Sequence, residues 1–167
     1  AEYTRGLVEA MAGRGRSTRD MLRTFTEITG ATIANAIEDF VRPRMDVDEV
    51  IVTGGGSGIG RCVAHELAAL GAYVVLVGRT QDKLSNVAAE IAEDGGNAGT
   101  ALCDIRIEDK VRETVAAIVA ERGRIHALVN NAGGQYPSPL ANITQKGFET
   151  VVRTNLVGGF VFAREAY

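Results

Sequence analysis

The spacing of hydrophobic positions changes near residue 47 and divides the chain into two parts. Before it, residues 1–45 are helical in character, because apolar residues recur every three to five positions and form one stripe on a helix. Ser17, followed by an acidic residue three positions later, is a variant of the capping box and predicts a helix start. Pro43 ends the pattern. The stripe consists of Met21, Leu22, Phe25, Ile28, Ile33, Ile37, Phe40 and Val41.

After residue 47, short apolar runs and amphipathic helical segments alternate four times. We expect strands at 50–52, 73–77, 98–103 and 127–129, and helices at 61–70, 84–92, 111–119 and 148–167. Alternation of this kind predicts a parallel sheet with helical crossovers. Nearly continuous apolar strands are typical of a sheet that is covered on both faces.

The predicted fold class is therefore α/β, a Rossmann-type doubly wound parallel sheet with an N-terminal helical segment. A complete dinucleotide-binding sheet has six strands, so four units indicate truncation after the fourth βα unit. We expect two domains, a helical segment of foreign character over 1–45 and the N-terminal part of a Rossmann domain over 46–167. The fourth strand would then be an open edge, and the isolated chain is expected to be marginally stable or to self-associate.

Composition excludes several classes of protein. Hydrophobic residues make up 46% of the chain and charged residues 23%, which is ordinary for a globular protein. A net charge of −3 gives no basic footprint for nucleic acid, and no apolar run nears the ~20 residues of a membrane helix. No signal peptide is visible, so a cytoplasmic location is expected. The chain starts at Ala1 and stops at Tyr167 inside a helical stretch, so both ends are expected to be cut.

The two cysteines offer little chemistry. Cys62 and Cys103 fit no metal or redox spacing, and we expect both to be buried as small apolar residues. With only two histidines in the chain, a metal site is not expected.

Three glycines, Gly54, Gly58 and Gly60, stand between the first strand and the helix that follows it. A tight turn there needs backbone freedom that a Cβ would deny. The helix start adds unpaired N–H groups and the positive end of the helix dipole, which together suit a pyrophosphate. The alternative is a turn that is only structural.

Arg79 follows the second strand, about 20 residues after the glycine turn. An NAD site would place Asp or Glu here to bind the ribose hydroxyls. A guanidinium instead suits a 2′-phosphate through its charge and forked donors, which favours NADP(H) over NAD. The alternative is a solvated surface arginine. Arg61 and Lys83 could assist, but we expect both to be solvated on helix surfaces.

Four motifs carry a resemblance to a known family. Residues 47–167 resemble the short-chain dehydrogenase/reductase family through Thr53-Gly54-x3-Gly58-Ile59-Gly60, Cys103-Asp104-Ile105, Asn130-Asn131-Ala132-Gly133 and Thr154-Asn155-Leu156. The resemblance implies an NADP(H)-binding site formed by Gly54, Ser57, Gly58, Ile59, Gly60, Arg79, Asp104, Ile105, Asn130, Ala132 and Gly133.

Within that site the resemblance implies particular roles. It assigns Asp104 to the adenine with Ile105 beside it, and residues 130–133 to the cofactor ribose and the central strand. It makes Asn155 the asparagine of a catalytic tetrad, where it orders a proton-relay water. The alternatives are that Asp104 is a turn residue and that Asn155 caps backbone groups in a kinked helix.

Residues 130–139 and 146–148 are similar to a narrower branch, the NADPH-dependent trans-2-enoyl-CoA reductases and their dienoyl-CoA reductase relatives. This similarity implies hydride transfer to an acyl-CoA-type small-molecule substrate, with reduction of a 3-ketoacyl thioester as the rival. It also implies that the full-length parent is a homo-oligomer.

Family members carry a catalytic serine, tyrosine and lysine well beyond the position of Asn155, so turnover by this chain alone is not expected. Tyr167 comes too soon to be that tyrosine, and we interpret it as a helix-packing aromatic.

Residues 1–56 are similar to the C-terminal part of anhydro-N-acetylmuramic acid kinases. Our hypothesis is a fusion of two unrelated pieces, and the alternative is a reductase with a helical extension. Three functions stay open: the cofactor-binding part of an NADP(H)-dependent reductase, a nucleotide-binding module without catalysis, and a sugar-kinase tail whose glycine loop contacts ADP.

Overall fold

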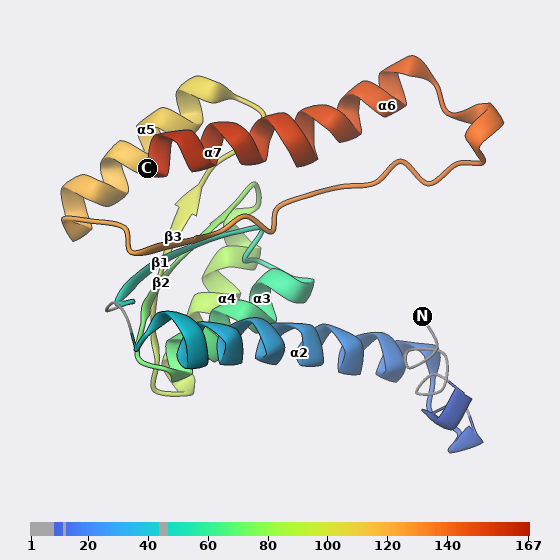
Figure 1. The fold of residues 1–167 in the computed structure, drawn as a ribbon, viewed down its shortest axis with the longest axis horizontal. Coiled ribbons are helices and arrows are strands. Elements are labelled where there is room, and N and C mark those ends of the chain that lie inside the picture. Colours follow the sequence, from blue (N-terminus) through green and yellow to red (C-terminus); the bar gives the residue numbers. More distant parts are fainter. Residues whose placement is uncertain (1–8, 12, 44–46) are drawn as a thin grey trace.

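The computed structural model describes residues 9–11, 13–43 and 47–167, and it is an α/β fold (Figure 1). The strands are β1 (Glu49–Thr53), β2 (Tyr73–Gly78), β3 (Asn97–Leu102) and β4 (Ala127–Val129). The helices are α2 (Thr18–Ala36), α3 (Gly58–Ala69), α4 (Gln81–Glu93), α5 (Glu108–Arg122), α6 (Gln145–Val152) and α7 (Gly159–Ala166). Turns of π-helix follow α2 (Ile37–Val41) and join α6 to α7 (Arg153–Gly158), and a 3₁₀ turn covers Leu140–Asn142.

The four strands form one parallel sheet in the order β3-β2-β1-β4. Val52 of β1 is level with Leu76 of β2 on one side and Val129 of β4 on the other. This arrangement confirms the predicted Rossmann-type sheet, because α3 joins β1 to β2, α4 joins β2 to β3, and α5 carries the chain back from β3 to β4 on the other side of β1.

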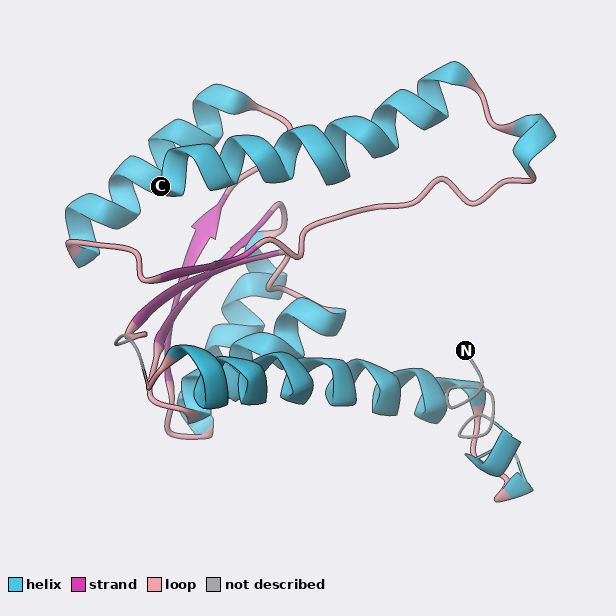
Figure 2. Cartoon of the chain, in the orientation of Figure 1, coloured by secondary structure: helices cyan, strands magenta, loops and turns pink. Residues whose placement is uncertain are grey.

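Alternating side chains of the central strands build a core on each face of the sheet. Val50 and Val52 of β1 pack with α2, α3 and α4 in one cluster, and Ile51 packs with α5 and α7 in the other. Figure 2 shows helices on both sides of the strands, so the sheet is doubly wound as predicted. Burial on both faces explains why these strands are apolar without alternation.

The predicted start of α2 is confirmed. The Ser17 hydroxyl accepts a hydrogen bond from the Asp20 backbone N–H at 3.1 Å, and the Asp20 carboxylate accepts one from the Ser17 N–H at 3.2 Å. The helix continues as a π-helical turn that ends at Val41, two residues before Pro43, in agreement with the predicted stop.

Only part of the predicted apolar stripe packs against the core, where Ile33, Ile37 and Val41 are partly buried. The buried residues of α2 are Gly30 and Ala34, whereas Leu22, Ile28 and, in the following turn, Phe40 are exposed. A Cβ on Gly30 would lie 2.8 Å from the Cβ of Cys62 on α3, so the two helices meet through small residues. Cys62 is half-buried and Cys103 is buried, so the prediction of burial is correct for Cys103 and wrong for Cys62.

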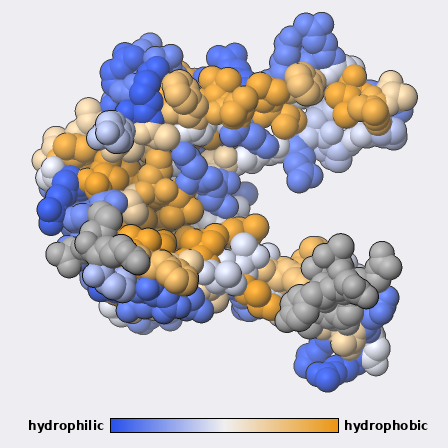
Figure 3. Space-filling view, in the orientation of Figure 1, coloured by the Kyte–Doolittle hydropathy of each residue, from blue (hydrophilic) through white to orange (hydrophobic). Residues whose placement is uncertain are grey.

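The predicted helix over 148–167 is confirmed as a continuous helical run over 145–166, but it contains a π-helical turn between α6 and α7 that was not predicted. Gly158 ends the turn in close contact with Ile105, where a Cβ would lie 2.9 Å from the Ile105 side chain. Tyr167 follows the last helical turn and is fully exposed, so its prediction as a packing aromatic is wrong. Apolar side chains gather along the outer surface of α6 and α7 (Figure 3).

Within the described residues, no helix has both the length and the apolar character needed to cross a membrane. In the same part of the chain, no group of three or more His, Cys, Asp or Glu side chains is placed to hold a metal ion.

Candidate functional site

A cleft of about 360 Å³ opens at the carboxyl ends of the strands. Residues that follow each of β1, β2, β3 and β4 line it, and Thr154 of the π-helical turn closes one side. Open α/β sheets bind their ligands at this edge, in the crevice beyond the strand ends. The position of the cleft therefore makes it the candidate site.

The glycine turn between β1 and α3 shapes the floor of this cleft. Gly54 donates its N–H to the Val77 carbonyl at 2.7 Å, which holds the turn against β2. A Cβ on Gly60 would collide with the Gly54 carbonyl oxygen and the Asn131 side chain. Gly60 therefore allows the first turn of α3 to approach the end of β1. Ser57 and Ile59 of that turn line the cleft.

The start of α3 is free to receive an acceptor. Ser57 is the N-cap residue, but its side chain makes no capping hydrogen bond. The first N–H groups of any α-helix lack partners within the helix, and the helix dipole is positive there. A Cβ on Gly58 would have no atom within 4 Å, so there is open space beside this turn.

Thr53 and Asn131 tie the ends of β1 and β4 together. The fully buried Thr53 hydroxyl accepts hydrogen bonds from the N–H groups of Asn131 and Ala132, both at 3.0 Å, and donates to the Val129 carbonyl at 3.3 Å. The Asn131 amide donates back to the Thr53 carbonyl at 2.9 Å. Both residues belong to motifs that carried the family resemblance, and residues 130–133 were assigned to the cofactor ribose and the central strand, but the link between Thr53 and Asn131 was not predicted. Their position was the signal in the sequence, since Thr53 directly follows one predicted strand and Asn131 lies two residues after another.

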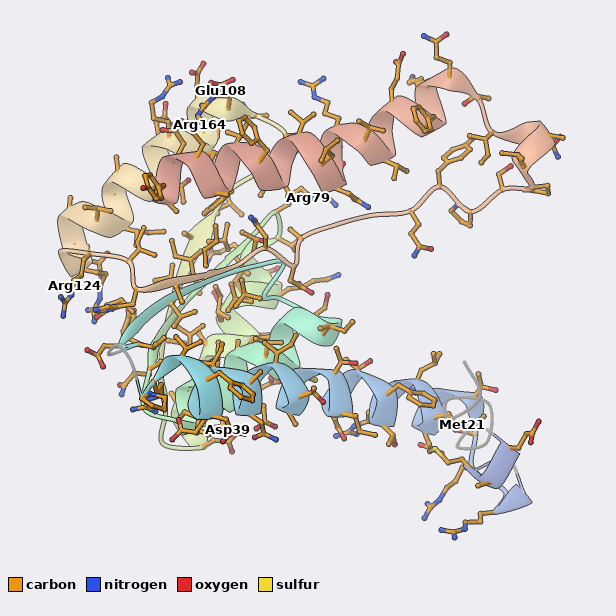
Figure 4. All side chains as sticks on the ribbon, viewed as in Figure 1. Met21, Asp39, Arg79, Glu108, Arg124 and Arg164 are labelled. Atoms are coloured by element: carbon orange, nitrogen blue, oxygen red, sulfur yellow. The ribbon has the colours of Figure 1, made fainter. Side chains whose placement is uncertain are left out.

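Arg79 is exposed at the end of β2 and lines the cleft. Among the described residues it has no hydrogen bond or ion pair, and Figure 4 shows it where the sheet ends beneath the π-helical turn. Lys83 is exposed on the surface of α4, as expected, and it also lines the cleft. Arg61 instead binds Glu90 on α4 at 2.6 Å and is not part of the cleft lining.

Asp104 follows β3 and faces the cleft from the turn that leads to α5. Its carboxylate accepts a hydrogen bond from the Arg106 backbone N–H at 3.0 Å, and it also pairs with the Arg106 guanidinium. The Arg106 hydrogen bonds, with a smaller contribution from the positive charge of Arg79, lower the pKa of Asp104 to about 2 despite its partial burial. Asp104 is thus both a turn residue and a cleft residue, and sequence reasoning missed Arg106.

Two asparagines fix the segment after β4. Asn130 donates its side-chain amide to the Gly159 carbonyl at 3.0 Å. Asn155 forms a reciprocal pair with Gly134, because its oxygen accepts the Gly134 N–H at 2.9 Å and its amide donates to the Gly134 carbonyl at 3.0 Å. The π-helical turn places Asn155 where it can reach this loop.

Most of the predicted site residues are brought together. Those that line the cleft are Gly54, Ser57, Ile59, Arg79, Asp104, Ile105, Ala132 and Gly133. Gly58, Gly60, Asn130 and Asn155 stand outside that lining, and the contacts of the last three support the loops that form it.

Comparison with known proteins identifies the same part of the chain. The family model for short chain dehydrogenase matches residues 48–167. A "Probable 2,4-dienoyl-CoA reductase [(2E)-enoyl-CoA-producing]" of Bacillus subtilis is 32% identical over 122 residues, which cover 73% of this chain and 48% of that protein. The kinase resemblance of residues 1–56 is not among these findings and stays a hypothesis.

Solved structures of similar proteins match the same part of the chain. The citronellol catabolism dehydrogenase AtuB of Pseudomonas aeruginosa PAO1 is 67% identical with a TM-score of 0.69, and the match covers 73% of this chain and 50% of that one. A metagenomic short-chain oxidoreductase, solved in complex with NADP, is 34% identical with a TM-score of 0.67, over 72% of this chain and 55% of that one. The chain thus spans about half the length of the relatives it matches.

Proposed function

The chain belongs to the short-chain dehydrogenase/reductase family, and from that premise we propose that it is the cofactor-binding part of an NADP(H)-dependent oxidoreductase. The observation that carries this proposal is that the start of α3 and Arg79, which has no ion-pair partner among the described residues, line the same cleft. Helix N–H groups suit a diphosphate, and a forked guanidinium suits a further phosphate.

The residues present fit such a cofactor. The close approach at Gly60 and the open space beside Gly58 leave room for a diphosphate at the helix start. Arg79 and Lys83 both line the cleft beside β2, and they favour a nucleotide that carries an extra phosphate over NAD(H). The metagenomic relative that holds NADP agrees with this choice.

We assign binding and orientation to the residues of this chain. The bound nicotinamide would supply or accept a hydride, which is chemistry that the side chains cannot provide. Ser57 and the backbone of the first α3 turn would hold the diphosphate, and Asp104 would accept a hydrogen bond from the adenine amino group. The pair that Asn155 forms with Gly134 would position the loop after β4 beside the nicotinamide end.

For the whole protein we propose hydride transfer to an enoyl-CoA or 3-ketoacyl thioester, in a homo-oligomer. The similarity to the Bacillus subtilis reductase supports the acyl thioester class. A second candidate is the oxidation or reduction of a citronellol-type compound, which the 67% identity to the Pseudomonas dehydrogenase favours. Assaying the parent enzyme with NADPH against an enoyl-CoA and with NADP⁺ against citronellol would separate the two.

Titration of this chain with NADPH, NADH and ADP tests the cofactor assignment. We expect NADPH to bind most tightly, since only NADPH carries the phosphate that Arg79 would recognise. Equal binding of NADPH and NADH would support a nucleotide-binding module without that discrimination. A preference for ADP with no response to NADPH would instead favour the sugar-kinase alternative and remove the reductase assignment.

A further inference from the structure

Four charged side chains line the cleft, three of them positive and one negative. Arg79, Lys83 and Arg106 are cationic, and Asp104 is the single carboxylate among the lining residues. Asp104 lies close enough to Arg79 for the positive charge of Arg79 to act on it. A carboxylate beside the cation that would bind a phosphate has two adverse effects. It can draw the cation into an ion pair, and it repels the phosphate.

Arg106 removes both effects by holding Asp104 itself. Its Nε lies 2.9 Å from Oδ1 and 3.1 Å from Oδ2 of the carboxylate, and its Nη2 lies 2.5 Å from Oδ2. The Arg106 backbone N–H adds a bond of 3.0 Å to Oδ1, which fixes the carboxylate on its own turn. A fork–fork pair of this kind is geometrically restrictive, so Asp104 is turned toward Arg106.

Arg79 lies beside this pair. Arg79 makes no ion pair among the described residues, although a carboxylate stands on the neighbouring strand end. Its guanidinium is therefore available to a ligand. Asp104 in turn keeps acceptor capacity, because a carboxylate offers about four lone-pair sites and can accept further donors.

We propose that Arg106 is a positioning residue that determines specificity for the 2′-phosphate of the cofactor. It acts through Asp104: by pairing with this carboxylate it leaves Arg79 free and lowers the repulsion that a 2′-phosphate would meet. This inference rests on the proposed function, because it concerns how the same cleft discriminates between phosphorylated and unphosphorylated adenosine ribose.

The test compares two small probes, 2′,5′-ADP and 5′-AMP, which differ only in the 2′-phosphate. Calorimetric titration of the wild-type chain gives the ratio of their dissociation constants. We expect Arg106→Gln to reduce the preference for 2′,5′-ADP by roughly tenfold, because the Asp104 charge is then uncompensated beside the phosphate. Adding Asp104→Asn to this variant is expected to restore most of the preference, because the repelling charge is gone.

Arg124→Gln is the matched control, since it removes the same charge from an exposed arginine at the opposite end of the sheet (Figure 4). We expect it to change the preference by less than about twofold, because screening weakens charge effects over such distances. Arg106→Lys keeps the charge but loses the fork, so an intermediate preference is expected. Circular dichroism of each variant establishes that it is folded before titration.

Each outcome supports or overturns the inference. A reduced preference that Asp104→Asn restores supports it. An unchanged preference in Arg106→Gln overturns it, as does a reduced preference that the double variant fails to restore, because Arg106 would then contact the phosphate directly. A wild-type chain without any preference for 2′,5′-ADP overturns the proposed NADP(H) site as well.

Discussion

Thr53→Val removes a single buried hydroxyl at the junction of β1 and β4. Valine has nearly the same shape, so the substitution leaves no large cavity at this fully buried position. It does remove the acceptor of the Ala132 N–H group and the donor to the Val129 carbonyl, whereas the Asn131 N–H group keeps the Val129 carbonyl as an acceptor at 3.0 Å. An unsatisfied buried polar group costs about 1–3 kcal/mol, and Ala132 is partly buried, so we expect a loss of about 1–3 kcal/mol.

Urea denaturation followed by circular dichroism measures this loss, and titration with NADPH measures its effect on the cleft. Binding should weaken as well, because Thr53 and Asn131 together hold the glycine turn against the segment after β4. Thr29→Val on the exposed surface of α2 is the control, and it should change stability by no more than about 0.5 kcal/mol. If Thr53→Val stayed within that range of the wild type, the hydroxyl would not hold the two strands together.

Three further predictions concern the turn, the charge and the helix contact. Gly60→Ala should destabilise the chain and abolish nucleotide binding, because the added Cβ would collide with backbone. Gly58→Ala should lower the free energy of unfolding, measured by urea denaturation, by only about 1 kcal/mol, because the cost is the left-handed backbone conformation alone. The stability that ionised Asp104 contributes should be fully present above its ordinary pKa of 3.8 and be lost as pH falls toward 2, which denaturation across pH would show. Gly30→Val should separate α2 from α3 and speed labelling of the Cys62 thiol by a disulfide reagent.

Control variants and contradicting outcomes can be stated for these three predictions. Gly13→Ala is the control for the helix contact, because a Cβ at Gly13 meets nothing within 4 Å, and equal labelling rates in the two variants would contradict a close contact at Gly30. Asp104→Asn should abolish the acid-dependent part of the stability difference. Binding by Gly60→Ala at wild-type affinity would show that close approach at this turn is not required.

The order of strands and helices was predictable because each βα unit encodes it locally. Runs such as Tyr73–Val77 are apolar throughout, and burial on both faces of a parallel sheet produces that pattern directly. The π-helical turn at Arg153–Gly158 was not predictable from the local pattern, and the contact that Gly158 makes there is with Ile105, a residue far away in the sequence. The role of Gly30 was missed for the same reason, since its partner Cys62 lies on another helix.

The site was predictable where a residue type carries the chemistry itself. Gly54 at the strand–helix turn and Arg79 at the next strand end line the cleft, and Gly60 acts by allowing the close approach of α3 to β1. Thr53 and Arg106 act through other residues, and their importance appears only once their hydrogen bonds are known. A sequence shows what a side chain can do, but not which neighbouring group needs it.

The most direct test of the account is a crystal structure of this chain with NADP⁺. The account predicts the diphosphate against the backbone N–H groups of the first α3 turn, from Gly58 to Gly60, and the 2′-phosphate within hydrogen-bond distance of the Arg79 guanidinium. A nucleotide bound elsewhere on the surface, or one in the cleft whose 2′-phosphate pointed away from Arg79 into solvent, would contradict it.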